Sequence, residues 1–413
     1  MRVMLVAHGF PPAAGGGTEI YVHDLARALR DDCGDEVLVL AREADPTRPE
    51  MDVRREDRGG IRLVHVNNTF RHCRSLEETY RNERARAIAL RVAEEFAPEV
   101  VHVHHLTGLS IDLVGALAGA GLPVIVTLND YWLMCHRGQL LDLDYERCAG
   151  PWPEGCARCL HAEAAAAAER TRHAREALGR AHLLLAPSLT LRQTFLGFGV
   201  DRERLVLVEQ GIDHAPFQGL RRTASDRLRI GFAGSLMVSK APHLLLEAFN
   251  GLPAGAANLT LYGGCVPYHG DDSYRQRLEP LLARPGVRHA GAIPHERMAG
   301  AFAAMDVLVV PSVWIENAPF VIREAFVAGV PVVASDLGGM RDLVTHEASG
   351  LLFRAGDVGA LRAALGRLID EPELRPRLRG GIPRMKTIQQ DAAETRERHR
   401  RPDRRAAATA RAG

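Results

Sequence analysis

Short apolar runs alternate with stretches of helical periodicity along almost the whole chain, and this pattern limits the fold more than any other feature. The apolar runs are bounded by glycine, proline or polar residues, as is typical of buried strands. Between them, apolar residues recur at helical spacing, so that Tyr21, Leu25 and Leu29 share one face. Consecutive parallel strands need a crossover that is usually a helix. The alternation therefore predicts an α/β protein with parallel sheets.

The pattern divides into two halves. In the first half we expect the strands VMLVAH, EVLVLA, IRLVHV, VVHVHH, PVIVTLND and HLLLAPS. In the second half we expect LRIGFAGS, LTLYGG, VRHAGAI, VLVVPS, PVVASD and the late edge strand LLFRAGD. A chain of 413 residues is longer than one core usually grows. We predict an N-terminal domain at 1–217, a linker at 218–228, a C-terminal domain at 229–375, and at 376–413 a helix with a basic tail that loses order from about Arg396.

Composition excludes some classes of function. The formal net charge is +1, which argues against a protein that binds nucleic acid through bulk charge. No apolar run reaches the roughly 18 residues that span a bilayer. The N-terminus indicates a first strand and not a secretion signal, so we expect a cytoplasmic protein. The seven cysteines are an odd number, which in that compartment argues against a disulfide framework.

The stretch WIENAPFVIREAFVAGVPVVASDLGG, from Trp314 to Gly339, is the strongest indication of a ligand site. Pro319 suits the first turn of a helix and Asn317 suits its cap, so a helix is expected to begin here. The free N–H groups of such a helix start attract anions. Glu316 precedes this start and Glu324 lies inside the helix, where both carboxylates can accept hydrogen bonds from sugar hydroxyls. The alternative is that both glutamates are solvated surface charges.

Two glycine-rich loops follow expected strands. Residues 231–240 read GFAGSLMVSK and end in Lys240, a flexible cation suited to a diphosphate. Gly15, Gly16 and Gly17 follow the first strand and allow a ligand to approach the backbone closely. Neither loop has the G-x-G-x-x-G spacing of a dinucleotide site. A dinucleotide-dependent oxidoreductase is therefore disfavoured.

Four cysteines are clustered in the run CHRGQLLDLDYERCAGPWPEGCARC, with the spacing C-x12-C-x7-C-x2-C. The last pair has the usual spacing of a metal knuckle, whereas the first spacing is unusually wide. We favour structural zinc, ahead of unligated thiols and of an iron–sulfur cluster. Four thiolates leave no open position on the metal, so the metal would be structural. The expected ligands are Cys135, Cys148, Cys156 and Cys159.

The E-x7-E stretch and the VPVVASDLGG that follows it resemble the retaining GT-B glycosyltransferases of glycosyltransferase family 4. The resemblance covers nearly the whole chain: PAAGGGTE at 12–19, APS at 186–188, EQGID at 209–213 and SGLLF at 349–353 are similar to family segments. It implies a GT-B fold, with two doubly wound Rossmann-like domains facing across a cleft. It also implies transfer of a hexosyl group from a nucleotide-diphosphate sugar with retention of configuration.

The resemblance also implies roles for individual residues. Glu324 would hold the ribose hydroxyls, Glu316 would contact the hexose, and Lys240 would neutralise the diphosphate. Gly16 and Gly17 would lie across the cleft, beside the diphosphate and the acceptor. The implied donor-binding residues are Gly16, Gly17, Gly234, Ser235, Lys240, Glu316, Asn317, Ala318, Pro319, Phe320 and Glu324.

Two positions depart from the family pattern. Many members have an arginine at the place of Ser235, and a histidine that contacts the transferred sugar at the place of Asn129. The family implies no protein nucleophile and no cofactor for catalysis, because the departing diphosphate helps to deprotonate the acceptor. The catalytic residues that we infer are Glu316, Lys240, Asn129 and Asp130. For the histidines on the end of the preceding strand, His102, His104 and His105, we expect packing or solvated roles.

The expected partners follow from these roles. They are a nucleotide-diphosphate sugar and a glycan, lipid-linked or small-molecule acceptor, as in polysaccharide or glycoconjugate biosynthesis, and they do not include nucleic acid. The sequence leaves a peripheral membrane contact open. The alternative function is a catalytically weak sugar-nucleotide or glycan-binding protein of the same fold, which the residues at positions 129 and 235 favour. The sequence does not fix the nucleotide base, the sugar or the acceptor.

Overall fold

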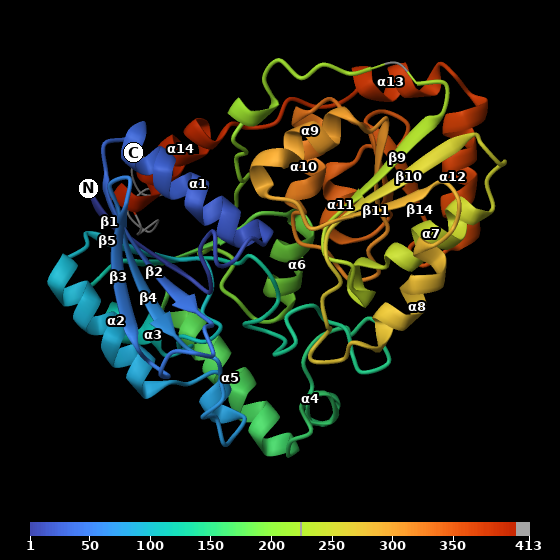
Figure 1. The fold of residues 1–413 in the computed structure, drawn as a ribbon. Coiled ribbons are helices and arrows are strands. Elements are labelled where there is room, and N and C mark those ends of the chain that lie inside the picture. Colours follow the sequence, from blue (N-terminus) through green and yellow to red (C-terminus); the bar gives the residue numbers. More distant parts are fainter. Residues whose placement is uncertain (224, 402–413) are drawn as a thin grey trace. The chain divides into compact units, whose positions relative to one another are not determined.

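The computed structural model describes residues 1–223 and 225–401, and these form two compact α/β units (Figure 1). Unit 1 comprises Met1–Gln139, Cys148–Asp213 and the chain from Lys386, and unit 2 comprises Leu140–Arg147 and His214–Met385. These limits differ from the predicted boundaries, because 140–147 belongs to unit 2 and the C-terminal helix belongs to unit 1. In the described part of the chain, no helix combines the length and the apolar character that crossing a bilayer requires.

Unit 1 contains an eight-stranded sheet in the order β3-β4-β2-β1-β5-β6-β7-β8, parallel except for β3. Its strands are β1 (Arg2–Ala7), β2 (Glu36–Glu43), β3 (Val53–Arg58), β4 (Ile61–Asn67), β5 (Val100–Val103), β6 (Val124–Thr127), β7 (Leu183–Ala186) and β8 (Leu205–Leu207). Its helices are α1 (Gly17–Asp31), the short η1 (Glu77–Thr79), α2 (Glu83–Phe96), α3 (Leu113–Gly119), α4 (Pro153–Leu160), α5 (Ala164–Arg180), α6 (Leu189–Gly197) and α14 (Ile388–Arg400). The central strands are buried almost throughout, as parallel strands covered on both faces are.

Unit 2 contains a six-stranded parallel sheet in the order β11-β10-β9-β12-β13-β14. Its strands are β9 (Leu228–Ala233), β10 (Ala257–Tyr262), β11 (Val287–Gly291), β12 (Val307–Val310), β13 (Val332–Ser335) and β14 (Gly350–Phe353). Its helices are α7 (Pro242–Asn250), α8 (Ser273–Leu282), α9 (Met298–Ala303), α10 (Phe320–Val327), α11 (Gly338–Leu343), α12 (Val358–Asp370) and α13 (Leu374–Gly380), with short turns η2 (Ala215–Phe217), η3 (Val238–Lys240) and η4 (His295–Arg297). Alternate strand residues face α7, α8 and α12 on one side and α9, α10 and α11 on the other (Figure 1).

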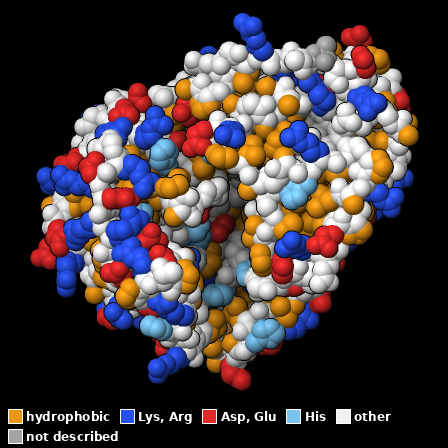
Figure 2. Space-filling model, viewed as in Figure 1, with side chains coloured by type: hydrophobic (Ala, Val, Ile, Leu, Met, Phe, Trp, Pro, Cys, Tyr) orange, Lys and Arg blue, Asp and Glu red, His pale blue; other side chains and the backbone are white. Residues whose placement is uncertain are grey.

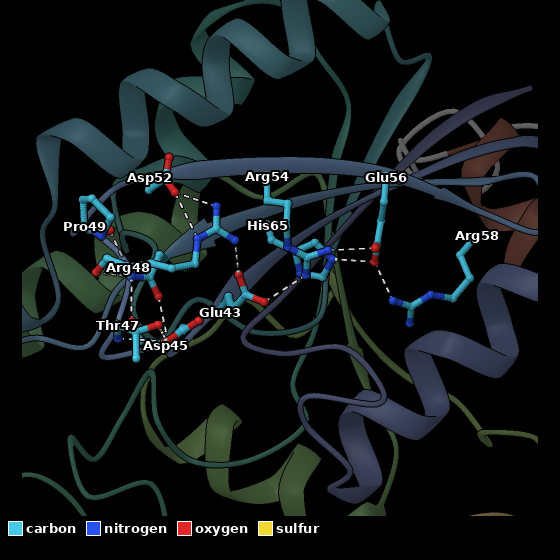
Figure 3. Close-up of polar contacts among 11 residues, drawn as sticks. Glu43, Asp45, Thr47, Arg48, Pro49, Asp52, Arg54, Glu56, Arg58 and His65 are labelled. Atoms are coloured by element: carbon cyan, nitrogen blue, oxygen red, sulfur yellow. Dashed lines mark hydrogen bonds and ion pairs between the residues drawn. The ribbon is translucent and has the colours of Figure 1, made fainter.

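Charged side chains cover the antiparallel edge strand β3. Arg54 lies between Glu43 of β2 and Glu56, at 2.9 and 2.7 Å, and Glu56 also contacts Arg58 and His65 (Figure 3). Basic and acidic side chains are intermixed over this part of unit 1 in the space-filling view (Figure 2). Charges on an edge strand oppose pairing with another sheet. They also explain why the sequence pattern did not predict β3.

Helix α14 packs on α1 within unit 1. Asp391 is buried and accepts hydrogen bonds from the Tyr21 hydroxyl at 2.8 Å, the Gly211 N–H at 2.9 Å and the Lys386 ammonium at 2.9 Å. The predicted loss of order from about Arg396 is wrong for residues 396–400, because helix α14 continues to Arg400 and the His399 side chain is buried. The rest of the predicted tail, residues 402–413, lies outside the described residues.

Three buried histidines connect α14 to the sheet. His102 lies 3.0 Å from His399 (Nδ1 to Nε2) and 2.7 Å from Thr127 (Nε2 to Oγ1), and its ring centre is 4.2 Å from that of His104. Burial lowers the pKa of His104 and of His399 to about 3, with His399 adding to the effect on His104 and Arg398 adding to that on His399. Burial also lowers the pKa of His102 well below its usual value. All three imidazoles are therefore neutral at physiological pH.

Acid should destabilise this packing. An unfolded histidine takes up a proton near pH 6.5, whereas His104 stays neutral to about pH 3, so below pH 6.5 the unfolded chain binds more protons. Stability should then fall by about 2 kcal/mol per buried histidine between pH 7 and pH 5. Chemical unfolding at both pH values measures this loss. His104→Leu should reduce the loss and the exposed control His346→Ala should not; an unchanged loss in His104→Leu would contradict the assignment.

Candidate active site

The strand order of unit 2 reverses between β9 and β12, and the predicted residues of this unit follow these two strands. In open sheets of this order, ligands bind outside the carboxyl ends of the strands at the reversal. Strand β9 leads through Gly234 and Ser235 into η3, which ends at Lys240. Strand β12 leads into the loop that contains Glu316 and then into α10. The topology thus brings together two segments that are 76 positions apart.

Lys240 and Glu316 form an ion pair at this point. The ammonium donates to Glu316 Oε1 at 2.6 Å, and the hydroxyl of Ser312 donates to the same oxygen at 2.7 Å. The Glu316 carboxylate is buried and the Lys240 side chain is 28% exposed. Lys240 also lies over the indole of Trp314, 5.4 Å from the ring centre. A buried carboxylate needs such compensation, and the partly exposed cation stays available to an anionic ligand.

The glycine pair after β13 packs against the loop before α10. The N–H of Gly339 donates to the Glu316 carbonyl at 2.7 Å, and a Cβ on Gly339 would lie 1.5 Å from the Asn317 carbonyl oxygen. Only glycine fits so close to backbone, which accounts for the GG that follows the VPVVASD run. The expected cap is wrong: Pro319, and not Asn317, is the N-cap residue, and α10 begins at Phe320. The loop is thus positioned by backbone packing.

Glu324 has a different partner from Glu316. Its Oε1 lies 2.8 Å from Nε2 of His295, which begins η4 after strand β11. The Glu324 side chain is 13% exposed and the His295 side chain 34% exposed. Sequence reasoning did not single out His295 or Ser312, because each is an isolated polar residue whose proximity to a glutamate depends on the fold.

The loop after β9 is shaped by glycines. Gly234 has φ 143°, and its N–H donates to the Tyr262 carbonyl at 2.9 Å. A Cβ on Gly263 would lie 1.9 Å from the Gly234 carbonyl oxygen, so the loops after β9 and β10 are in direct backbone contact. Ser235 is half-buried in this turn. Lys240 follows at the end of η3, where it contacts the loop after β12.

Unit 1 carries four ionisable side chains where its own strand order reverses, between β1 and β5. His8 lies 3.1 Å from Glu19, His105 lies 3.0 Å from Asp130, and the two imidazole ring centres are 4.0 Å apart. A Cβ on Gly16 would lie 2.6 Å from Glu19 Oε2, so the glycine loop leaves room for this carboxylate. Of these four, the sequence predicted only Asp130 as a site residue. Glu19 could have been predicted from the sequence, because it is the last residue of the GGGTE segment.

The histidines keep both carboxylates of this group ionised. Burial raises the pKa of Glu19, but the hydrogen bond and the charge of His8 outweigh it, and the net pKa is lowered. Burial acts in the same way on Asp130, where the charge and hydrogen bond of His105 lower the net pKa. The pKa of His8 is lowered by burial and by His105. The group therefore favours ligands that donate hydrogen bonds.

Asn129 is engaged within unit 1. Its amide nitrogen donates to the His104 carbonyl at 3.0 Å, and its carbonyl oxygen accepts from the Gln210 amide at 3.0 Å. It borders a cavity of about 20 Å³ that is also lined by His104, Thr127 and Asp130, roughly enough for one water molecule. Through these contacts Asn129 links the segments that contain His104 and Gln210. Its catalytic role stays a prediction. Gly16 and Gly17 stand at the start of α1, as N-cap and first residue.

The four clustered cysteines are each partly buried, and none of them is joined in a disulfide. Burial raises the pKa of Cys156 and the thiols of Cys135, Cys148 and Cys159 raise it further, so the four lie near one another. The buried Arg170, whose pKa is lowered to about 10 by burial, is close to Cys135 and Cys156. Among the described residues, no three His, Cys, Asp or Glu side chains are arranged to hold a metal ion. The four-thiolate zinc site therefore remains a prediction from the spacing.

Comparison with known proteins identifies relatives of the whole chain. Residues 15–215 match the family model described as Glycosyltransferase Family 4, and residues 227–371 match the model described as Glycosyl transferases group 1. A GDP-mannose-dependent alpha-mannosyltransferase of Mycolicibacterium smegmatis is 31% identical over 90% of this chain and 89% of its own. A D-inositol 3-phosphate glycosyltransferase of Xylanimonas cellulosilytica is 28% identical over 92% of this chain and 90% of its own.

Solved structures show the same fold. Sucrose-phosphate synthase from Thermosynechococcus elongatus superposes with a TM-score of 0.75 at 20% identity, over 97% of this chain and 98% of its own. HepE of Anabaena, solved in complex with UDP-glucose, gives a TM-score of 0.68 at 18% identity, over 96% of this chain and all of its own (100%). Both are similar to the chain over both units.

Breaking the Lys240–Glu316 pair should destabilise unit 2. Lys240→Met leaves a buried carboxylate with only the Ser312 hydroxyl as a partner, so we expect a loss of about 1–3 kcal/mol. The double variant Lys240→Met with Glu316→Gln should lose less than the sum of the single losses. Chemical unfolding measures all three. The control Arg275→Ala, which removes an exposed pair with Glu279, should cost under about 0.5 kcal/mol; additive losses at 240 and 316 would argue against coupling.

The cysteine spacing predicts about one zinc per purified chain. Elemental analysis measures it, and Cys156→Ser with Cys159→Ser should remove the metal and lower thermal stability. The isolated Cys265→Ser serves as the control, because it lies in unit 2 and outside the cluster. Less than about 0.2 equivalents of zinc or iron in the unmodified protein would contradict the site.

Proposed function

The chain belongs to glycosyltransferase family 4, and from this premise we propose that it moves a hexosyl group from a nucleotide-diphosphate sugar to an acceptor hydroxyl with retention of the anomeric configuration. It is a glycosyltransferase of the GT-B fold. The observation that best supports the proposal is the Lys240–Glu316 pair, which follows the two strands between which the order of the unit 2 sheet reverses. The alternative of a catalytically weak binding protein receives no support from the relatives, which are named as enzymes.

On the donor side, Lys240 and the N–H groups at the start of α10 would hold the diphosphate, Glu316 the hexose and Glu324 the ribose. The bond between the anomeric carbon and the diphosphate oxygen breaks, and the acceptor oxygen bonds to that carbon on the same face. The acceptor proton passes to the departing diphosphate. Lys240 stabilises the negative charge that develops on this leaving group, and positioning supplies much of the remaining rate enhancement. The backbone of Gly234, Ser235, Asn317 and Ala318 completes the proposed donor site.

On the acceptor side, the ionised carboxylates of Glu19 and Asp130 would accept hydrogen bonds from acceptor hydroxyls. His8 and His105 keep these carboxylates in place through the contacts described above. Asp130 suits this role better than Asn129, whose amide is already hydrogen-bonded at both ends. Because two negative charges lie together in this group, a neutral polyhydroxyl acceptor fits it better than an anionic one.

The relatives suggest two candidates for the nucleotide base of the sugar donor, guanine and uracil. One relative is named for GDP-mannose, and HepE was solved with UDP-glucose. We propose a glycan, lipid-linked or small-molecule acceptor and a role in polysaccharide or glycoconjugate biosynthesis in the cytoplasm. The positive charge of Lys240 would stabilise the diphosphate leaving group, as a divalent cation does in other transferases.

Turnover should depend strongly on Lys240. We expect Lys240→Ala to lower kcat by about 100-fold or more, because it removes the charge that stabilises the leaving group. The assay measures release of nucleoside diphosphate from UDP-, GDP- and ADP-sugars with a panel of sugar acceptors, after a thermal-shift screen for the preferred base. NMR of the product should show the anomeric configuration of the donor. Arg275→Ala is the control; inversion, or full activity of Lys240→Ala, would refute the mechanism.

A further inference from the structure

His295 is tied to the carboxylate that we assign to the donor ribose. Its Nε2 lies 2.8 Å from Glu324 Oε1, and the two residues come from segments 29 positions apart. We propose that His295 is a positioning residue for Glu324, and that the two side chains together select the ribose diol of the donor nucleotide. This inference rests on the proposed function, because it needs Glu324 in the donor site.

The hydrogen-bond pattern of Glu324 supports this assignment. A carboxylate can only accept, so Nε2 of His295 must carry the proton and donate it to Oε1. Within the described part of the chain, no hydrogen bond is made to the second oxygen, Oε2, and the side chain is 13% exposed. One oxygen is therefore fixed by the protein and the other is left for a ligand. A carboxylate held at one oxygen loses less rotational freedom when it binds a hydroxyl.

The segment that carries His295 packs on the apolar core of unit 2. Ile293 and Met298 flank His295 in the chain, and both pack against the apolar cluster that contains Ile322 and Ala325 of α10. This packing anchors the chain on both sides of η4 to the apolar cluster to which α10 also contributes. The local geometry is thus set before a ligand arrives, as expected of a residue that positions another.

The alternative is a stabilising pair with no part in recognition. If His295 positions Glu324, loss of its hydrogen-bond donor should weaken binding of ribonucleotides more than binding of deoxyribonucleotides. If the pair is purely structural, its loss should weaken binding of all nucleotides equally. The chain offers variants that separate the two. His295→Gln keeps an N–H donor on a side chain of similar reach, and His295→Ala removes it. His289→Ala is a matched control, because His289 lies on β11 of the same unit and contacts the Gly263 carbonyl.

Titration calorimetry with UDP, GDP and ADP and with their 2′-deoxy counterparts tests the proposal. His295→Ala should bind the preferred ribonucleotide about three- to tenfold more weakly, the effect of one lost hydrogen bond. It should bind the 2′-deoxynucleotide almost as well as the unmodified protein does, so that discrimination between the two sugars falls. His295→Gln should restore most of the discrimination, and in turnover His295→Ala should raise donor KM more than it lowers kcat.

Two negative outcomes have different meanings. If none of the three nucleotides binds the unmodified protein, the proposed function fails. If a nucleotide binds but His295→Ala weakens the ribose and deoxyribose forms equally, or His295→Gln does not recover discrimination, the function stands and the role of His295 is refuted. Thermal melting of each variant verifies that it is folded, with His289→Ala as the reference.

Discussion

Parallel strand pairing is the constraint on which the rest of this structure depends. After each parallel strand the chain must cross back to the edge of the sheet where the strand began. The segments that follow the strands therefore all start at the same edge, the one formed by the carboxyl ends. Where the strand order reverses, two neighbouring segments diverge and leave room for a ligand. In unit 2 this point falls between β9 and β12, and in unit 1 between β1 and β5. Lys240 with Glu316, and His8 with His105, lie at these points because the topology places them there.

Compensation of buried charge is the second requirement, and both units meet it in the same way. The buried carboxylates of Glu316, Glu19 and Asp391 are paired with Lys240, His8 and Lys386, and the partly exposed Asp130 is paired with His105. A buried carboxylate without such a partner would be costly. Three of the four pairs belong to the groups of residues to which we assign substrate binding. Asp391 instead links α14 to α1 by accepting a hydrogen bond from Tyr21.

Much of the fold was predictable from the sequence, and the exceptions have physical reasons. The apolar strands were identified because strands covered on both faces are nearly continuous in hydrophobicity. Strand β3 was not identified because it is an edge strand with the sequence VRREDR, and β8 was not because it has only three residues. The tail prediction failed at Arg396–Arg400 because α14 buries few apolar residues and is held by Asp391, Thr395 and His399, which are polar.

The sequence by itself determined the fold class, the family and the identity of the residues around the E-x7-E stretch, because these depend on local periodicity and on residue order. Only the tertiary structure decided which side chains meet. It paired Glu316 with Lys240 and Ser312, joined Glu324 to His295, and assembled Glu19, His8, His105 and Asp130 from separate segments. The reason is that hydrogen bonds and ion pairs act over a few ångströms, and positions far apart in the chain come within that range only through sheet order and core packing.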